Sequence, residues 1–62
     1  DTRIYPMPLT SGQEWHIQGL QANDRVLVYN TNMQVVNNHR TLDKGIYYVV
    51  INNRKAHKII VQ

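Results

Sequence analysis

The sequence predicts an all-β fold, a small antiparallel β-sandwich of about six to seven strands in one domain that spans residues 1–62. Apolar residues come in short bursts without a useful helical period, and Asn, Asp, Gly and Pro separate these bursts. Several bursts alternate apolar with polar residues, which is typical of a strand with one buried face. The chain has no cysteine, so disulfides cannot support this small core.

Two short strands are expected in the first 18 residues. Residues 3–5 ("RIY") read as a strand that the following "PMP" ends, because proline has no N–H for the ladder. Residues 14–18 ("EWHIQ") alternate, so we expect Trp15 and Ile17 on the buried face and the polar residues on the other.

A hairpin is predicted in the middle of the chain. Residues 19–24 are a connection rich in turn formers. Residues 25–30 ("RVLVYN") form the next strand, and residues 30–33 ("NTNM") form a turn because Asn tolerates positive φ. Residues 34–36 ("QVV") are expected to return as a strand.

A second hairpin is predicted at the end of the chain. Residues 37–45 are mostly polar connection, and residues 46–51 ("IYYVVI") are apolar on both faces, as in a central strand covered on both sides. Residues 52–55 ("NNRK") form a turn, and residues 57–62 ("HKIIVQ") form the last strand.

The start of the central strand refines the fold class. In the stretch "DKGIY", Gly45 lets the backbone turn without a Cβ clash, and Tyr47 can return its hydroxyl to a nearby backbone group as a tyrosine corner. This pattern favours an immunoglobulin-like sandwich, with Val49 at the position where antibody domains carry a cysteine. The alternative is a plain hairpin with a glycine turn in another small barrel. The two faces of the strand are expected to be Tyr47, Val49 and Ile51 toward the core and Ile46, Tyr48 and Val50 away from it.

The reactive residues are not grouped as catalysis requires. The four carboxylates are scattered, and no phosphate loop, nucleophile elbow or zinc-protease motif is present. His16 and His57 are expected at solvent-facing strand positions and His39 in a loop, so we predict no metal site. We therefore predict that the protein is not an enzyme, with no catalytic residue, no cofactor and no metal.

Charge and hydropathy exclude other classes. The net charge is +3, but the basic residues are scattered, so we expect no nucleic-acid partner; an OB- or SH3-like nucleic-acid binder is the weaker alternative. No apolar run approaches the roughly 20 residues that a transmembrane helix needs. The first residues lack the long apolar region of a signal peptide, so the chain is expected to be a piece of a longer protein.

Five motifs in order carry a resemblance to a known family. They are "YPMP" (5–8), "SGQEWHIQGL" (11–20), "RVLVYNTNMQVV" (25–36), "LDKGIYYVVI" (42–51) and "KIIVQ" (58–62). Together they resemble the C-terminal sorting domain of the type IX (Por) secretion system of the Bacteroidetes. The chain departs from the family pattern at Met7 between the prolines, at Met33 where a hairpin glycine is usual, and at Gln62 where a basic residue is frequent. A first strand of the family domain can lie upstream of Asp1.

The resemblance implies a secretion signal. Such a module directs its parent protein across the outer membrane and is recognised there, and in many cargoes a sortase-like protease removes it. The implied partners are the type IX translocon, outer-membrane shuttle and sortase components, and the upstream cargo domain. The implied location is the periplasm in transit, then the outer membrane, the cell surface or the medium. The resemblance assigns recognition to the last strand, namely to Lys58, Ile59, Ile60, Val61 and Gln62. Structural roles are predicted for Gly19, Leu42, Gly45 and Tyr47.

Two further expectations concern binding. Apolar strands near both termini leave edges through which a homodimer can form. A different function is a C-terminal carbohydrate- or protein-binding β-sandwich module of a secreted hydrolase, in which Trp15, Tyr29 and Tyr48 are the candidate stacking residues.

Overall fold

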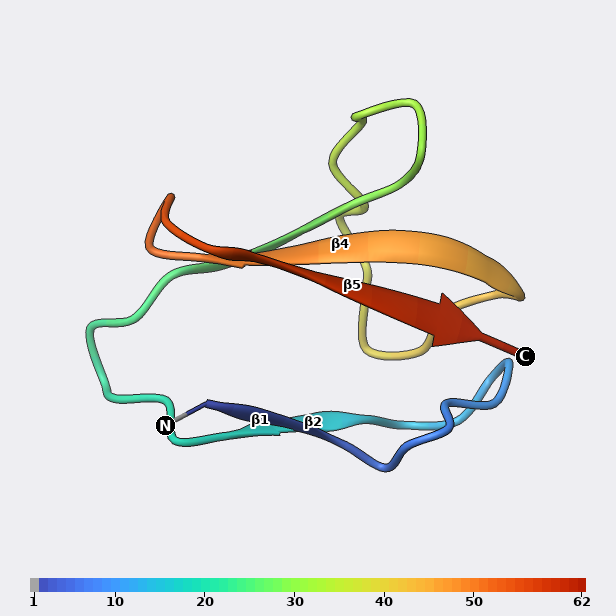
Figure 1. Cartoon of the computed structure of the whole chain (residues 1–62), viewed down its shortest axis with the longest axis horizontal. Coiled ribbons are helices and arrows are strands. Elements are labelled where there is room, and N and C mark those ends of the chain that lie inside the picture. The colour runs from blue at the N-terminus through green and yellow to red at the C-terminus, as the bar shows by residue number, and fades with distance from the viewer. Residues whose placement is uncertain (1) are drawn as a thin grey trace.

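The computed structural model describes residues 2–62, which form five β-strands and no helix. The strands are β1 (Arg3–Tyr5), β2 (His16–Gln18), β3 (Val26–Tyr29), β4 (Gly45–Ile51) and β5 (Ala56–Val61). Antiparallel pairing joins β1 to β2 in one sheet and orders the other as β3-β4-β5. Figure 1 shows the β1-β2 sheet lying below β4 and β5. The prediction of an all-β domain is confirmed. None of the described residues belongs to a helix that could cross a membrane.

Strand β4 is the central strand, as its uninterrupted apolar sequence predicts. Val49 pairs with Val28 of β3 on one side and with His57 of β5 on the other. Because side chains alternate along a strand, Tyr47, Val49 and Ile51 share the inner face, where Val49 is fully buried. The facing predicted for this strand is therefore confirmed.

The core lies between the two sheets. Its six buried residues are Leu9, Val28, Leu42, Val49, Ile59 and Val61. From the β1-β2 side, Ile4, Trp15 and Ile17 pack against this cluster. The polar residues of the 14–18 segment are exposed, so its predicted alternation is also confirmed.

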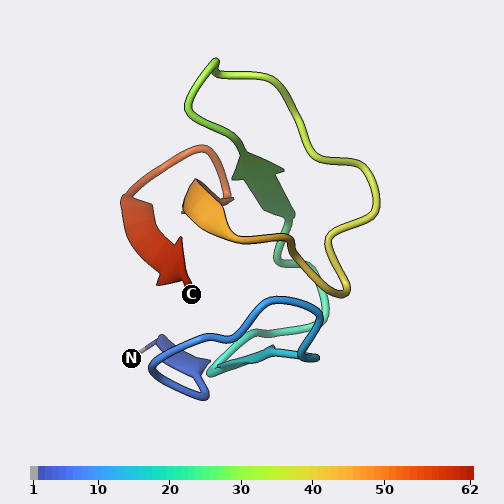
Figure 2. The same ribbon diagram turned by 90° about the vertical axis from the view of Figure 1, so that its right-hand side faces the viewer.

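The prediction of a strand at residues 34–36 is wrong. Without it, the described residues form five strands instead of the six to seven that we expected. Only Val35 forms an isolated bridge, to Tyr29, and the Val36 N–H donates to the Val28 carbonyl oxygen at 2.7 Å. Val35 is 46% exposed, so its side chain gains little from burial, and packing does not favour further pairing of this segment with β3. Polar Asn37 and Asn38 then lead the chain away from β3, as the long loop in Figure 2 shows.

Two bridges outside the strands extend the sheets. Leu9 pairs in parallel with Val61, so the segment after the prolines leaves β1 and joins the edge of the other sheet. Two hydrogen bonds continue this pairing, from the Gln62 N–H to Leu9 O at 2.9 Å and from the Ser11 N–H to Gln62 O at 2.8 Å. In the first sheet, Glu14 pairs with Thr41 in the antiparallel sense.

Asparagine and its positive φ explain the hairpin turn at residues 52–55. Asn52 and Asn53 have φ of 56° and 55°, and the Arg54 N–H donates to Ile51 O at 3.1 Å. Asn is one of the few non-glycine residues that adopts this backbone region readily. The predicted turn is confirmed.

Candidate functional site

The last strand divides its side chains between the core and the surface. Ile59 and Val61 are 1% and 2% exposed, and they belong to the core cluster. Lys58, Ile60 and Gln62 are exposed, and Ile60 keeps 54% of its surface accessible. Only three of the five residues assigned to recognition can therefore offer side chains to a partner.

Lys58 and Ile60 stand on an outer face that is mostly apolar. This outer face consists of the β3, β4 and β5 side chains that point away from the core: Leu27, Tyr29, Ile46, Tyr48, Val50, Ala56, Lys58 and Ile60. Tyr48 is the register partner of Lys58, and Ile46 is the register partner of Ile60. Ile46 is 38% exposed and Leu27 is 36% exposed, so part of this apolar surface is uncovered.

The positive charge of the molecule is concentrated on the same hairpin. Residues 45–62 contain Arg54, Lys55 and Lys58 and no carboxylate, while the other four basic residues balance the four acidic residues of the chain. The hairpin that carries the last strand therefore holds the whole net charge of +3. A charge of one sign on one element favours partners of the opposite sign.

A second surface feature is an open cleft that lies beside β2. It has a volume of ≈ 450 Å³ and is lined by Tyr5, Trp15, His16, Ile17, Leu20, Val26, His39 and Arg40. The rings of Tyr5 and His16 lie 5.3 Å apart between centroids, and those of Trp15 and His39 lie 6.0 Å apart. We call this the aromatic cleft.

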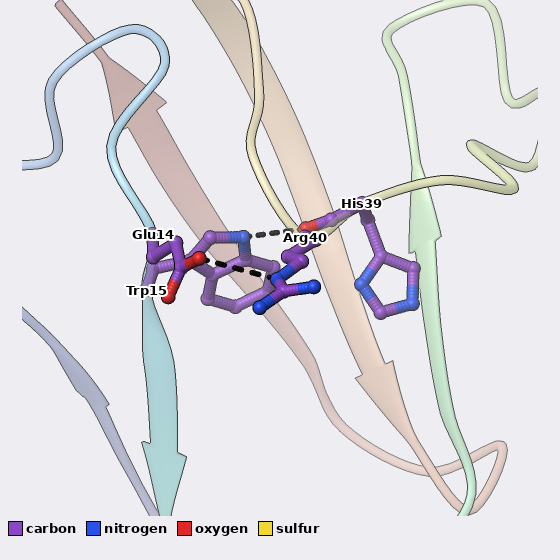
Figure 3. Close-up of polar contacts among 4 residues, drawn as sticks. All are labelled: Glu14, Trp15, His39 and Arg40. Carbon is purple, nitrogen blue, oxygen red and sulfur yellow. Dashed lines mark hydrogen bonds and ion pairs between the residues drawn. The ribbon is translucent and has the colours of Figure 1, made fainter.

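Trp15 connects the aromatic cleft to the long loop before β4. Its indole N–H donates to the backbone carbonyl oxygen of His39 at 2.6 Å, and the Arg40 guanidinium contacts the Glu14 carboxylate at 3.2 Å (Figure 3). The Trp15 bond is partly buried, whereas both ion-pair side chains are more than half exposed. The indole therefore contributes more to holding this loop than the ion pair does.

The three aromatic residues predicted to stack on a ligand do not form one surface. Trp15 packs toward the core from the β2 side, while Tyr29 and Tyr48 are register partners on the outer face. The three-stranded sheet lies between these two places. Sequence spacing could not reveal this separation because it depends on how the sheets stack.

The histidines are also apart. His16 is exposed and His39 is half-buried in the loop beside Trp15, in agreement with the prediction. His57 was expected to face solvent, but it lies half-buried on the inner side of β5, because it shares the parity of Ile59 and Val61. Within residues 2–62 no three His, Asp or Glu side chains come close enough to hold a metal ion.

The corner at the start of β4 has the geometry expected of it. The Tyr47 hydroxyl donates to the Asp43 carbonyl oxygen at 3.0 Å, and the ring lies over Gly45, whose φ is +155°. Leu42, directly before the corner, is buried at 4% exposure. Gly19, in the connection after β2, has a φ of 95°. Of the four residues assigned a structural role, Leu42 is buried in the core, Gly19 and Gly45 have positive φ, and half-buried Tyr47 makes the corner hydrogen bond.

An asparagine network that the sequence did not indicate joins the β2–β3 connection to the last hairpin. Asn52 donates through Nδ2 to the Asp24 carboxylate at 2.9 Å and accepts the Arg25 N–H at 2.8 Å. The Gln21 N–H donates to the other carboxylate oxygen of Asp24 at 2.8 Å. This backbone hydrogen bond, then the one from Asn52 and the charge of Arg54, holds the pKa of Asp24 below its ordinary value.

Comparisons of the chain with protein-family models, with curated proteins and with solved structures found no match. The geometry and the sequence motifs are therefore the basis for the function proposed below.

Proposed function

We propose that the two sheets form an immunoglobulin-like sandwich. In this correspondence β1 and β2 are strands A and B, β3 is C, and β4 and β5 are F and G. The bridge of Glu14 to Thr41 supports it, because strand E pairs with B in that fold. The Tyr47 hydrogen bond supports it as well, because a tyrosine corner stands near the start of strand F.

We propose that this module is a C-terminal sorting signal of the type IX secretion system. It directs its parent protein across the outer membrane, and a sortase-like protease can then remove it. The single observation that carries the proposal is the order of the five motifs; four of them contain most or all of a strand, and "YPMP" begins at the last residue of β1. "LDKGIYYVVI" covers the corner and β4, and "KIIVQ" covers the end of β5, where Lys58 and Ile60 are exposed.

The partners follow from this role. They are the translocon, shuttle and sortase components of the system and the cargo domain upstream, and the module passes from the periplasm to the outer membrane, the cell surface or the medium. The proposed reading step is binding, so the module needs no catalytic residue, cofactor or nucleic-acid contact. A homodimer through edge strands stays a prediction; sedimentation at millimolar concentration tests it.

An export assay tests the proposed function. The chain is fused behind a periplasmic reporter in a host that has a type IX system, and a host without the translocon serves as the control. We expect the reporter at the surface in the first host and in the periplasm in the second. Equal periplasmic retention of a folded fusion in both hosts contradicts the proposal.

The aromatic cleft favours a second function, the binding of carbohydrate by a module of a secreted hydrolase. Its rings come from Tyr5, Trp15, His16 and His39, and Tyr29 and Tyr48 take no part. Titration of the purified chain with plant and bacterial polysaccharides, followed by Trp15 fluorescence, tests this. Saturable binding that Tyr5→Ala weakens supports it, and an unchanged signal with every polysaccharide contradicts it.

A further inference from the structure

We propose that the free edge of β5, the backbone of Ala56–Ile60, is a docking site for an extended peptide with an acidic side chain opposite Lys58. Apolar side chains two residues to either side of the acidic one complete the partner segment. The inference rests on the proposed function in one respect, because it takes β5 as the strand that the partner reads. It adds the mode of binding, which is strand addition, and the chemistry of the bound segment.

The edge is open over most of its length. β5 pairs with β4 on one side, and on the other side only its C-terminal end has a partner, Leu9. The hydrogen bonds of Gln62 to Leu9 and Ser11 show that the backbone N–H and C=O of Gln62 point away from β4, toward the free edge. Since these groups alternate in direction along a strand, Ala56, Lys58 and Ile60 direct theirs the same way. Within residues 2–62, no segment pairs there with Ala56 or Lys58.

The molecule itself places a short segment of its own chain on this edge. The Leu9–Ser11 segment lies in parallel beside Val61 and Gln62, and it makes two backbone hydrogen bonds to Gln62, of 2.9 and 2.8 Å. An incoming segment can occupy the stretch before it, beside Ala56 to Ile60. Backbone hydrogen bonds supply affinity in such complexes, and side chains on alternate positions supply specificity.

The side chains beside the edge define what the segment carries. An antiparallel partner places one residue directly opposite Lys58, with its side chain on the outer face. Lys58 is exposed there, so a carboxylate opposite it forms a cross-strand ion pair. Two residues farther along, Ile60 is 54% exposed and offers apolar surface, which its partner Ile46 extends. A β-branched residue fits that position.

Charge selects this partner over a second copy of the chain. Antiparallel pairing of β5 with β5 of another copy brings two Lys58 side chains close together, and it also joins two hairpins of net charge +3. A lysine on an edge strand is a common device against such self-pairing. An acidic segment meets no such repulsion, and its attraction to the hairpin speeds association at low salt.

Binding of synthetic peptides to the purified chain tests the proposal. The probe is the capped peptide Thr-Val-Thr-Glu-Thr-Val-Thr, and its matched control has Lys in place of Glu. Calorimetry gives the affinity, and NMR amide shifts locate the contact. We expect the Glu peptide to bind at least about fivefold more tightly and to shift the amides of Ala56, Lys58 and Ile60.

Methylated probes separate strand addition from simple charge attraction. A methyl group on the amide nitrogen of the peptide's Glu removes a backbone hydrogen bond to Lys58, so binding should be lost. A methyl group on the amide nitrogen of the neighbouring Thr points away from β5, so binding should be kept. In the protein, Lys58→Glu should reverse the preference between the two peptides, whereas the exposed control Lys44→Glu should not. Equal affinity for both peptides, tolerance of the methylated Glu, or reversal by Lys44→Glu would each overturn the inference.

The outcome is distinguishable from failure of the proposed function. A chain that exports its reporter but does not discriminate between the peptides overturns the docking mode alone. A chain that binds the Glu peptide at β5 but leaves its reporter in the periplasm overturns the sorting role alone.

Discussion

The hydroxyl of Tyr47 donates a hydrogen bond to the backbone carbonyl oxygen of Asp43 at 3.0 Å. This hydrogen bond links the loop residue Asp43 to β4, which is the central strand of the three-stranded sheet. Leu42 lies buried directly before it, and Val49 is buried two residues after Tyr47. The corner therefore fixes where the polar loop ends and where the core strand begins.

Tyr47 should contribute through both its ring and its hydroxyl. We expect Tyr47→Phe to lower the free energy of unfolding by about 0.5–1 kcal/mol, because the hydrogen bond is lost at an exposed site. Tyr47→Ala should lower it by about 2–3 kcal/mol, because the half-buried ring is lost as well. Urea unfolding measures both. Tyr48→Ala, on the outer face, is the control and should cost less; equal losses from Tyr47→Ala and Tyr48→Ala would contradict the assigned facing.

Gly45 should not tolerate a branched side chain. Its φ of +155° lies where L-residues are strained. A Cβ there would lie 3.7 Å from the Tyr47 ring, an ordinary contact distance, so the cost comes from the backbone conformation. We expect Gly45→Val to destabilise the fold by about 1–3 kcal/mol. Lys44→Val, at the neighbouring exposed position, is the matched control and should melt near the wild type. A wild-type melting temperature for Gly45→Val would refute the corner geometry.

Met33 has a φ of 61°, in the left-handed region. It stands at a position where the sorting-domain family that the sequence resembles usually has a glycine. The side chain is 68% exposed, so it gains little from packing. We expect Met33→Gly to stabilise the chain by about 1 kcal/mol, because glycine relieves the left-handed backbone strain. Met7→Gly, at another exposed methionine without positive φ, should not stabilise. Thermal melts of the two variants decide, and destabilisation by Met33→Gly would speak against this turn.

Asp24 should make the stability depend on pH in the acid range. Its pKa is lowered in the folded chain, chiefly by the hydrogen bond from the Gln21 N–H. Its stabilising effect is therefore complete above the unfolded pKa of about 3.9 and is lost as pH falls through the lower folded value. The stability difference between wild type and Asp24→Asn should be larger at about pH 7 than at about pH 3. An equal difference at both values would exclude this role.

The parts of the fold that could be predicted from sequence depend on local patterns. The apolar stretch around Val49 predicts a central strand, and the alternation around Trp15 predicts one buried face. Asn52 predicts a turn because its backbone tolerance is intrinsic. In each case the side-chain period or residue type alone is sufficient.

The parts that could not be predicted depend on contacts between distant segments. Nothing near Leu9 in the sequence indicates that it pairs with Val61, and nothing near His39 indicates that its carbonyl oxygen receives the Trp15 indole. The prediction of a strand at 34–36 was wrong for the same reason, because whether this segment pairs beyond Val35 depends on whether a distant segment covers Val35. The alternation of side chains along β5 predicts which of its residues are exposed. Its unpaired edge could not be predicted, because that depends on the order of the strands in the sheet.

Export of a reporter carrying the double substitution Lys58→Glu and Gln62→Glu tests the central claim most directly. Both residues are exposed, so the variant should fold with a stability within about 0.5 kcal/mol of the wild type, as circular dichroism of the purified chain will verify. The sorting role read through β5 predicts that the wild-type chain carries its reporter to the cell surface and that the folded double variant leaves it in the periplasm. Export of the folded double variant at the wild-type rate would contradict recognition through these two side chains, and periplasmic retention of the wild-type fusion would contradict the sorting role itself.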